Sequence, residues 1–149
     1  MSDNSLFSPE KLEMLDYKII KGQIDTPEEF NSGKIKQYHL ENSLELGFNL
    51  AKKLVKADFL IEIKTESIGG NKQEASSIFH LVFIFKVDNL DELAVADKNR
   101  TIKLEPHLGN ALSSITYSTS RGILLTRLQG TAFNNFILPV INPNKLLHR

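Results

Sequence analysis

The stretch that decides the fold is PHLGNALSSITYSTSRGILLTRL, residues 106–128, with Gly130 shortly after it. Pro106 or Asn110 can open a helix, and Gly130 can close one. We therefore predict a single long helix over this range. At a rise of about 1.5 Å per residue it extends for roughly 33 Å, which is enough to cross a whole domain.

The predicted helix is apolar on two opposite faces. Between Leu108 and Leu128 the formal charges are limited to Arg121 and Arg127. A helix that is apolar on both sides must be covered on both sides. At a period of 3.6 residues one face collects Leu108, Ala111, Leu112, Ile115, Thr119 and Gly122, and the opposite face collects Tyr117, Ser120, Leu124 and Leu128.

Two arrangements satisfy this requirement. The helix lies in the core of one subunit, or it packs on its own sheet with one face and on a partner's helix with the other. Small residues such as Ser118 and Gly122 permit the close approach that the second arrangement needs. The second arrangement predicts an oligomer interface formed by Leu112, Ile115, Tyr117, Thr119, Gly122 and Leu124.

Composition limits the class of protein. The chain has 149 residues, which suits one ordinary domain, residues 1–149, with a sizeable core. It contains no cysteine, and this excludes disulfides, thiolate zinc sites and cysteine catalysis. The N-terminus has no secretory signal pattern, and no apolar run approaches the roughly 20 residues of a membrane span. We therefore expect a cytoplasmic protein that does not associate with membranes.

The charges are unevenly placed, although the formal net charge is zero. All 18 acidic residues lie at or before Glu105, whereas residues 106–149 carry four basic residues and no acid. Four scattered bases are too few to follow a phosphate backbone, so we expect no nucleic-acid partner. Because interface cores are depleted in carboxylates, the acid-free segment favours burial.

Alternating apolar residues predict strands in the first part of the chain. Leu15–Ile24 alternates and stops at Pro27, and Phe59–Ile63 alternates as a half-buried antiparallel strand. A hairpin turn leads to Ser77–Val87, which is apolar on both faces and needs a cover. Strands followed by one long helix predict an α+β fold, with the helix packed on an antiparallel sheet. A further extended segment gathers Tyr38, Leu40, Leu44, Leu46, Phe48 and Leu50 on one side.

The sequence contains no evident reactive constellation. Residues 69–72, GGNK, lack the spacing of a phosphate-binding loop and are typical of a hairpin turn. No serine has a nucleophile–base context, and Glu41 and Glu45 have no apolar pocket that could tune them. We expect no enzyme, no cofactor and no metal. The histidines also lack the spacing of metal ligands: His39, His80, His107 and His148.

The C-terminal third carries a family resemblance. Ile115–Leu124, ITYSTSRGIL, continues through Gly130-Thr131 to Ile137–Asn142, ILPVIN. A long helix, a Gly-Thr turn and a short extended segment with a Pro-Val-Asn-like end resemble the protein-export chaperone SecB and its relatives. Leu15 to Pro27 is similar to the first strand of that family.

Two further segments match the order of the same family. Leu44 to Phe48 is similar to its crossover segment. Ala57 to Thr65 and Ser77 to Val87 are similar to the hairpin of its sheet. The resemblance implies an α+β fold with a four-stranded antiparallel sheet and one long helix packed on it.

The resemblance also implies a function. SecB-like proteins are homotetramers, built as dimers of dimers with the long helices at the interface. They hold unfolded polypeptide clients in apolar surface grooves without ATP and pass preproteins to the preprotein translocase ATPase. By this resemblance the client-binding surface comprises Tyr38, Leu40, Leu44, Leu46 and Phe48, with Phe136 and Leu146 as walls.

Three features depart from the family. The chain is neutral, whereas the export chaperones are strongly acidic, and up to Arg149 we expect neither their second long helix nor their charged metal-binding tail. Arg121-Gly122 lies in mid-helix, where many exporters carry other residues. These differences weaken an assignment to dedicated preprotein export. The alternative is a SecB-fold protein dedicated to one client, such as a toxin–antitoxin component. An enzyme that uses the cavity of the fold is disfavoured, because no nucleophile–base pair is present.

Overall fold

The computed structural model describes residues 7–69 and 73–147. The strands are β1 (Leu12–Asp25), β2 (Ile35–Asn49), β3 (Leu54–Ser67), β4 (Ser76–Val87), β5 (Ala94–Ala96) and β6 (Ile102–Leu104). The helices are α1 (Leu90–Leu93), α2 (Pro106–Arg127) and α3 (Asn144–Leu147), with short 3₁₀ turns at η1 (Pro9–Lys11) and η2 (Ser32–Lys34).

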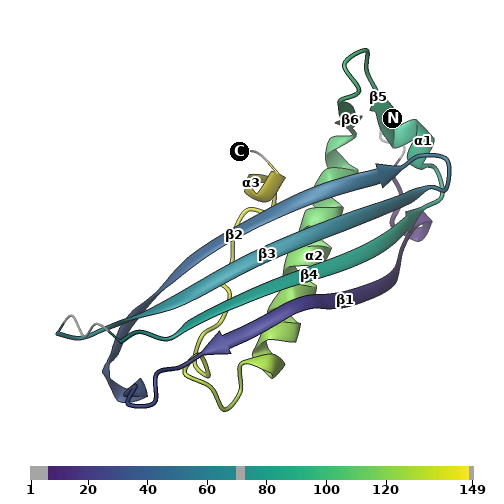
Figure 1. Cartoon of the computed structure of the whole chain (residues 1–149). Helices are drawn as coiled ribbons and strands as arrows, with labels where there is room; N and C mark the ends of the chain where they lie inside the picture. The colour runs from purple at the N-terminus through teal and green to yellow at the C-terminus, as the bar shows by residue number, and fades with distance from the viewer. Residues whose placement is uncertain (1–6, 70–72, 148–149) are drawn as a thin grey trace.

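The first four strands form one antiparallel sheet in the spatial order β1-β4-β3-β2. The long helix α2 crosses one face of this sheet, and the C-terminal segment runs along the same side (Figure 1). The short strands β5 and β6 pair with each other near the start of α2. The predicted α+β fold, with a helix packed on an antiparallel sheet, is confirmed.

The core lies between the sheet and α2. Alternate residues of β3 and β4 face α2 and are buried, whereas their neighbours on the outer face are more exposed. Phe59 and Phe83 are fully buried, and α2 adds Leu112 and Leu124 from the other side. Each fully buried side chain of this size stabilises the fold by about 1.5–3 kcal/mol.

The ends of α2 follow the sequence signals. The Glu105 side chain accepts a hydrogen bond from the Leu108 backbone N–H at 3.0 Å, and Pro106 occupies the first turn. At the other end Gly130 has a positive φ of 78°, a conformation that glycine adopts without a steric penalty. The helix ends at Arg127, one residue before the predicted end.

The sequence of residues 131–139, TAFNNFILP, predicts an extended segment that ends at Pro139, and this prediction is wrong in its first half. Residues 132–135 form a turn, in which the Asn134 N–H donates to the Thr131 carbonyl at 3.1 Å. The physical reason is the spacing of two aromatic residues. Phe133 and Phe136 lie three positions apart, and a turn brings both rings under Tyr38, at centroid distances of 6.1 and 5.2 Å.

Candidate functional site

An open apolar cavity of about 830 Å³ lies where the end of β2 meets β6, the first turns of α2, and α3. Its large apolar side chains come from β2, β6 and α3: Leu46, Phe48, Ile102, Leu104 and Leu147. We call the surface formed by these five residues the edge groove. All five side chains are half-buried, so they have apolar area left to cover.

Local structure holds the walls of the edge groove in place. Asp97 closes the β5–β6 hairpin, because its Oδ1 accepts the N–H groups of Asn99 and Thr101 at 2.8 and 3.0 Å. Gly109 lets Leu104 approach α2 closely. A Cβ at Gly109 would lie only 3.3 Å from the Leu104 side chain, so a larger residue would push this wall outward.

The polar rim of the edge groove includes Glu105 and His107. Burial raises the pKa of the Glu105 carboxyl, but hydrogen bonds from His107 and from the Leu108 N–H outweigh it and bring the pKa below its ordinary value. Glu105 is therefore an ionised helix cap, with His107 Nδ1 at 2.7 Å from its Oε1. Both of its oxygens are engaged in structure rather than free for chemistry.

The predicted client-binding residues divide into three groups. Leu46 and Phe48 line the edge groove. Leu44, Phe136 and Leu146 belong to the core, with exposed fractions of 3%, 8% and 4%. The remaining two, Tyr38 and Leu40, are half-buried and packed against that core.

The reason for this division is the path of the C-terminal segment. It covers the first part of β2 through Phe133 and Phe136 and leaves the last inward positions of the strand open. The role of Leu46 and Phe48 in binding stays a prediction. Sequence reasoning missed Ile102, Leu104 and Leu147 as neighbours of these two residues.

The predicted oligomer interface also divides. Leu112, Tyr117 and Leu124 are buried against the sheet of the same chain, where Tyr117 meets Phe59 edge-on at 5.9 Å. The Tyr117 hydroxyl donates to the Pro139 carbonyl at 2.6 Å, which fixes the C-terminal segment to α2. These three residues therefore form an internal contact in the chain.

The remaining interface residues lie on the other side of α2. Thr119 and Gly122 line an open cleft of about 800 Å³, together with Tyr17 and Ile19 of β1. Tyr17 is 53% exposed there, although its ring stacks on Phe83 at 6.4 Å. We call this surface the β1–α2 cleft. Ile115, the sixth predicted residue, is half-buried on α2.

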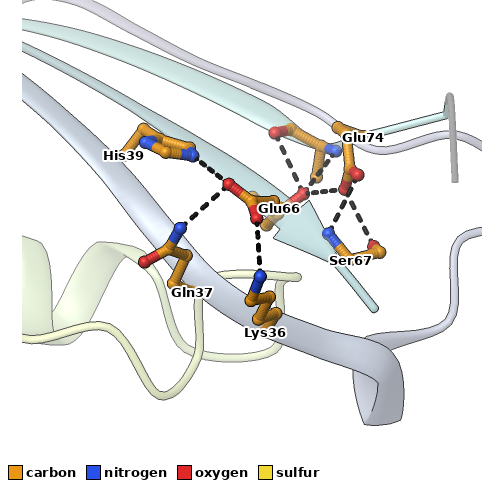
Figure 2. Close-up of polar contacts among 8 residues, drawn as sticks. Lys36, Gln37, His39, Glu66, Ser67 and Glu74 are labelled. Atoms are coloured by element: carbon orange, nitrogen blue, oxygen red, sulfur yellow. Dashed lines mark hydrogen bonds and ion pairs between the residues drawn. The ribbon is translucent and has the colours of Figure 1, made fainter. Parts of the chain in front are cut away.

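A polar cluster joins the start of β2 to the end of β3, at the end of the sheet opposite the edge groove (Figure 2). Glu66 accepts hydrogen bonds from Gln37 and His39 and lies 3.5 Å from Lys36 Nζ. The hydrogen bonds from Gln37 and His39 hold the pKa of Glu66 below its ordinary value. An ionised, fully engaged carboxylate is a poor proton donor, so we interpret this cluster as a staple between the two strands.

A second carboxylate closes the β3–β4 connection. Glu74 accepts the Ser67 N–H at 2.9 Å and the hydroxyls of Ser67 and Thr65 at 2.8 Å each (Figure 2). The hydrogen bond from the Ser67 N–H is the main reason that the pKa of the Glu74 carboxyl lies below its ordinary value. Residues 70–72 lie outside the described part of the chain, so the turn predicted at residues 69–72 is not seen directly. The strands on either side of it, β3 and β4, pair antiparallel, which confirms that they form a hairpin.

We expect the stability contributed by Glu74 to depend on pH. A carboxylate with a lowered folded pKa stabilises the fold at neutral pH and loses that contribution as the pH falls through the folded value. Glu74→Gln should therefore lower the melting temperature at pH 7, and the difference from wild type should shrink as the solution is acidified. Thermal melts of both proteins from pH 7 to pH 3 check this. A difference that stays constant with pH would contradict it.

A further histidine–carboxylate pair lies on the outer face of the sheet, where His80 Nε2 is 2.8 Å from Asp58 Oδ1. Over residues 7–69 and 73–147, no group of three or more histidine or acidic side chains is placed to hold a metal ion. His148 lies outside this part. None of the described helices is long and apolar enough to cross a membrane.

Comparisons with known proteins connect this architecture to one fold. A scan against protein-family models gives no match, and a search of curated proteins gives none either. A search of solved structures does match. One similar structure is the Mycobacterium tuberculosis Rv1957 SecB-like chaperone in complex with a ChAD peptide from the Rv1956 HigA1 antitoxin.

The match with Rv1957 is extensive in structure and low in sequence. It covers 89% of this chain and 91% of that chain with a TM-score of 0.62, at 11% sequence identity. At this identity the likeness concerns the fold. The chain has the SecB-like fold, with a four-stranded antiparallel sheet and one long helix packed on it.

Proposed function

We propose that this protein is an ATP-independent holdase that binds unfolded or pre-export polypeptides in the edge groove. The observation that carries the proposal is the open apolar lining of that groove, from Leu46 and Phe48 to Leu104. The SecB-like fold and the engagement of Glu66 and Glu105 in structural hydrogen bonds support a binding protein over an enzyme. The site of action that fits this role is the cytoplasm, and the translocase ATPase is a partner to be tested.

Apolar burial supplies the driving force for this binding. Covering apolar surface contributes about 25 cal/mol per Å², from which the ordering of a flexible client must be subtracted. A groove of this size therefore favours weak binding of many apolar segments over tight binding of one sequence. That property suits a holdase, because the client must later be released.

The experiment that tests this function is suppression of aggregation. An unfolded test protein is diluted into buffer with or without this protein, and light scattering is followed without nucleotide. We expect scattering to fall in proportion to the protein added, and added ATP to change nothing. Scattering that stays at the level of a bovine albumin control would contradict the proposal.

A second candidate function is the protection of one dedicated client, such as a toxin–antitoxin component. The observation that favours it is the similar Rv1957 structure, which holds a peptide of an antitoxin. The two functions differ in selectivity. A dedicated protein should bind one peptide from its gene neighbourhood at least about 100-fold more tightly than unrelated apolar peptides, whereas a general holdase should bind all of them within roughly tenfold.

We also propose that the protein assembles as a homotetramer, a dimer of dimers, through the β1–α2 cleft. The cleft exposes Tyr17 and small residues of α2, and none of the described residues that line it is acidic. Two copies can therefore approach closely there without desolvating a carboxylate. This surface replaces the earlier six-residue interface, because three of those residues are internal.

We expect Gly122→Glu to reduce the solution mass. A Cβ at Gly122 meets no atom within 4 Å in the chain, so the variant should fold, while its carboxylate would be desolvated in the assembly. Gly122→Ala is the matched control and should keep the wild-type mass. Light scattering on both proteins gives the answer. If Gly122→Glu folds and keeps the wild-type mass, the β1–α2 cleft is not the interface.

A further inference from the structure

The hairpin formed by β5 and β6 gives the edge groove one charged wall. Its two strands form a two-stranded sheet of their own, and the hairpin projects from the molecule at the start of α2 (Figure 1). Ile102 and Leu104 line the edge groove with apolar side chains, and Lys103 lines it as well. The wall on this side of the groove is therefore part apolar and part cationic.

The hairpin carries more positive than negative charge. Lys98, Arg100 and Lys103 are exposed, and within the described part of the chain none of them has an ion pair. The one acid of the hairpin, Asp97, closes the turn, because its Oδ1 accepts two backbone N–H groups at 2.8 and 3.0 Å. The three cations thus remain available to a ligand in the groove.

The surroundings of the groove add little negative charge to balance these cations. Of the described residues that line it, Glu105 alone is acidic, and both of its oxygens are already hydrogen-bonded, by His107 and by a backbone N–H of α2. The helix α3, which also borders the groove, carries the exposed Lys145. The acids of α1, Asp91 and Glu92, are exposed and do not line the groove.

We propose that the preferred partner of the edge groove is a segment that combines an apolar stretch with flanking Asp or Glu residues. The apolar stretch covers the lining, and the flanking carboxylates lie beside the cations of the hairpin. Opposite charges across an interface add specificity and speed association. A segment with basic flanks meets like charges instead and is disfavoured. The inference rests on the proposed function and names the class of segment that the same site selects.

A mixed partner fits this surface better than a plain polyanion does. A nucleic acid would use the cations of the hairpin and leave the apolar lining exposed to water. Three cations at one hairpin are also few for following a phosphate backbone. A segment that is both apolar and acidic uses the two kinds of surface together.

The test uses fluorescein-labelled peptides and the full-length protein. Three peptides share a core of about five leucine and phenylalanine residues, flanked at each end by about two glutamates, two glutamines or two lysines. A fourth peptide keeps the glutamates and has serine in place of the apolar core. Fluorescence anisotropy at low salt measures the four dissociation constants.

We expect the glutamate-flanked peptide to bind roughly threefold to tenfold more tightly than the glutamine-flanked peptide, and the lysine-flanked peptide roughly threefold more weakly than the latter. The serine-core peptide should bind at least about tenfold more weakly than the glutamate-flanked peptide, because it covers no apolar surface. Raising the ionic strength from about 0.05 M to about 1 M should bring the three flanked peptides to similar affinities, since salt screens the charges.

A variant of the hairpin assigns the preference to its cations: Lys98→Gln, Arg100→Asn and Lys103→Gln together. Asparagine is chosen at position 100 because Arg100 has a positive φ of 63°, which asparagine tolerates. The ratio of glutamate-flanked to glutamine-flanked affinity should fall to about one. A matched control removes three exposed charges from β1 and η2 and should keep the wild-type ratio: Lys18→Gln, Lys21→Gln and Lys34→Gln.

Several outcomes would overturn the inference and leave the proposed function standing. These are equal affinities of the three flanked peptides at low salt, tightest binding of the lysine-flanked peptide, or a hairpin variant that keeps the wild-type ratio. A serine-core peptide that binds as tightly as the glutamate-flanked peptide would also overturn it, because the surface would then attract any polyanion. Failure of all four peptides and of an unfolded protein to bind would overturn the proposed function together with the inference.

Discussion

Leu124→Glu is expected to lower the free energy of unfolding by roughly 3–5 kcal/mol or more, which approaches the whole stability of an ordinary domain. Leu124 is 2% exposed between α2 and the sheet. The change removes apolar burial and places a carboxylate where the core cluster offers it no partner. Urea unfolding followed by circular dichroism measures the loss.

The matched control is the next residue. Leu125 is 43% exposed, so Leu125→Glu keeps its charge in water and should change the free energy of unfolding by no more than about 0.5 kcal/mol. Similar unfolding midpoints for the two variants would mean that α2 does not pack on the sheet with the face that carries Leu124.

The second large effect concerns binding. Leu46→Ser combined with Phe48→Ser should weaken the binding of unfolded clients by about 100-fold. Each of the two half-buried side chains, when it loses its apolar contact with the client, should cost roughly 1.4 kcal/mol of binding free energy, which corresponds to a tenfold loss of affinity. Both side chains line the edge groove, and neither is fully buried in the chain. The melting temperature should fall only modestly.

Two further variants separate binding from folding. Leu60→Ser removes a leucine from the outer face of the same sheet, where it is 45% exposed, and should leave both binding and melting unchanged. Leu44→Ser lies two residues before Leu46 but is 3% exposed, so it should lower the melting temperature strongly. If the Leu46→Ser and Phe48→Ser double variant loses as much melting temperature as Leu44→Ser does, then Leu46 and Phe48 belong to the core and do not form a separate binding surface.

The sequence predicted the positions of the helices and strands better than the burial of the residues within them. The helix over residues 106–128 was visible because a proline, a glycine and a two-sided apolar pattern delimit it. The alternation in Phe59–Ile63 likewise identified a half-buried strand and its inward face. These signals are local, since each depends on the periodicity of one element.

The burial of single residues within those elements could not be predicted. The apolar side of residues 38–50 is interrupted in sequence only by Asn42, yet the C-terminal segment covers its first part and leaves Leu46 and Phe48 open. That cover depends on the turn that directs Phe133 and Phe136 under Tyr38, which is a contact between distant segments. In the same way, the two apolar faces of α2 were visible, but periodicity could not show that Leu124 faces the sheet and Gly122 the solvent.

The central claim is that an unfolded polypeptide binds in the edge groove without nucleotide. Its most direct test is titration of a labelled, permanently unfolded protein with wild type, with the Leu46→Ser and Phe48→Ser double variant, and with Leu60→Ser, all in the absence of ATP. We predict saturable binding by wild type and by Leu60→Ser, and a loss of about 100-fold for the double variant. Equal affinity of all three proteins, or no binding by wild type, would contradict the claim.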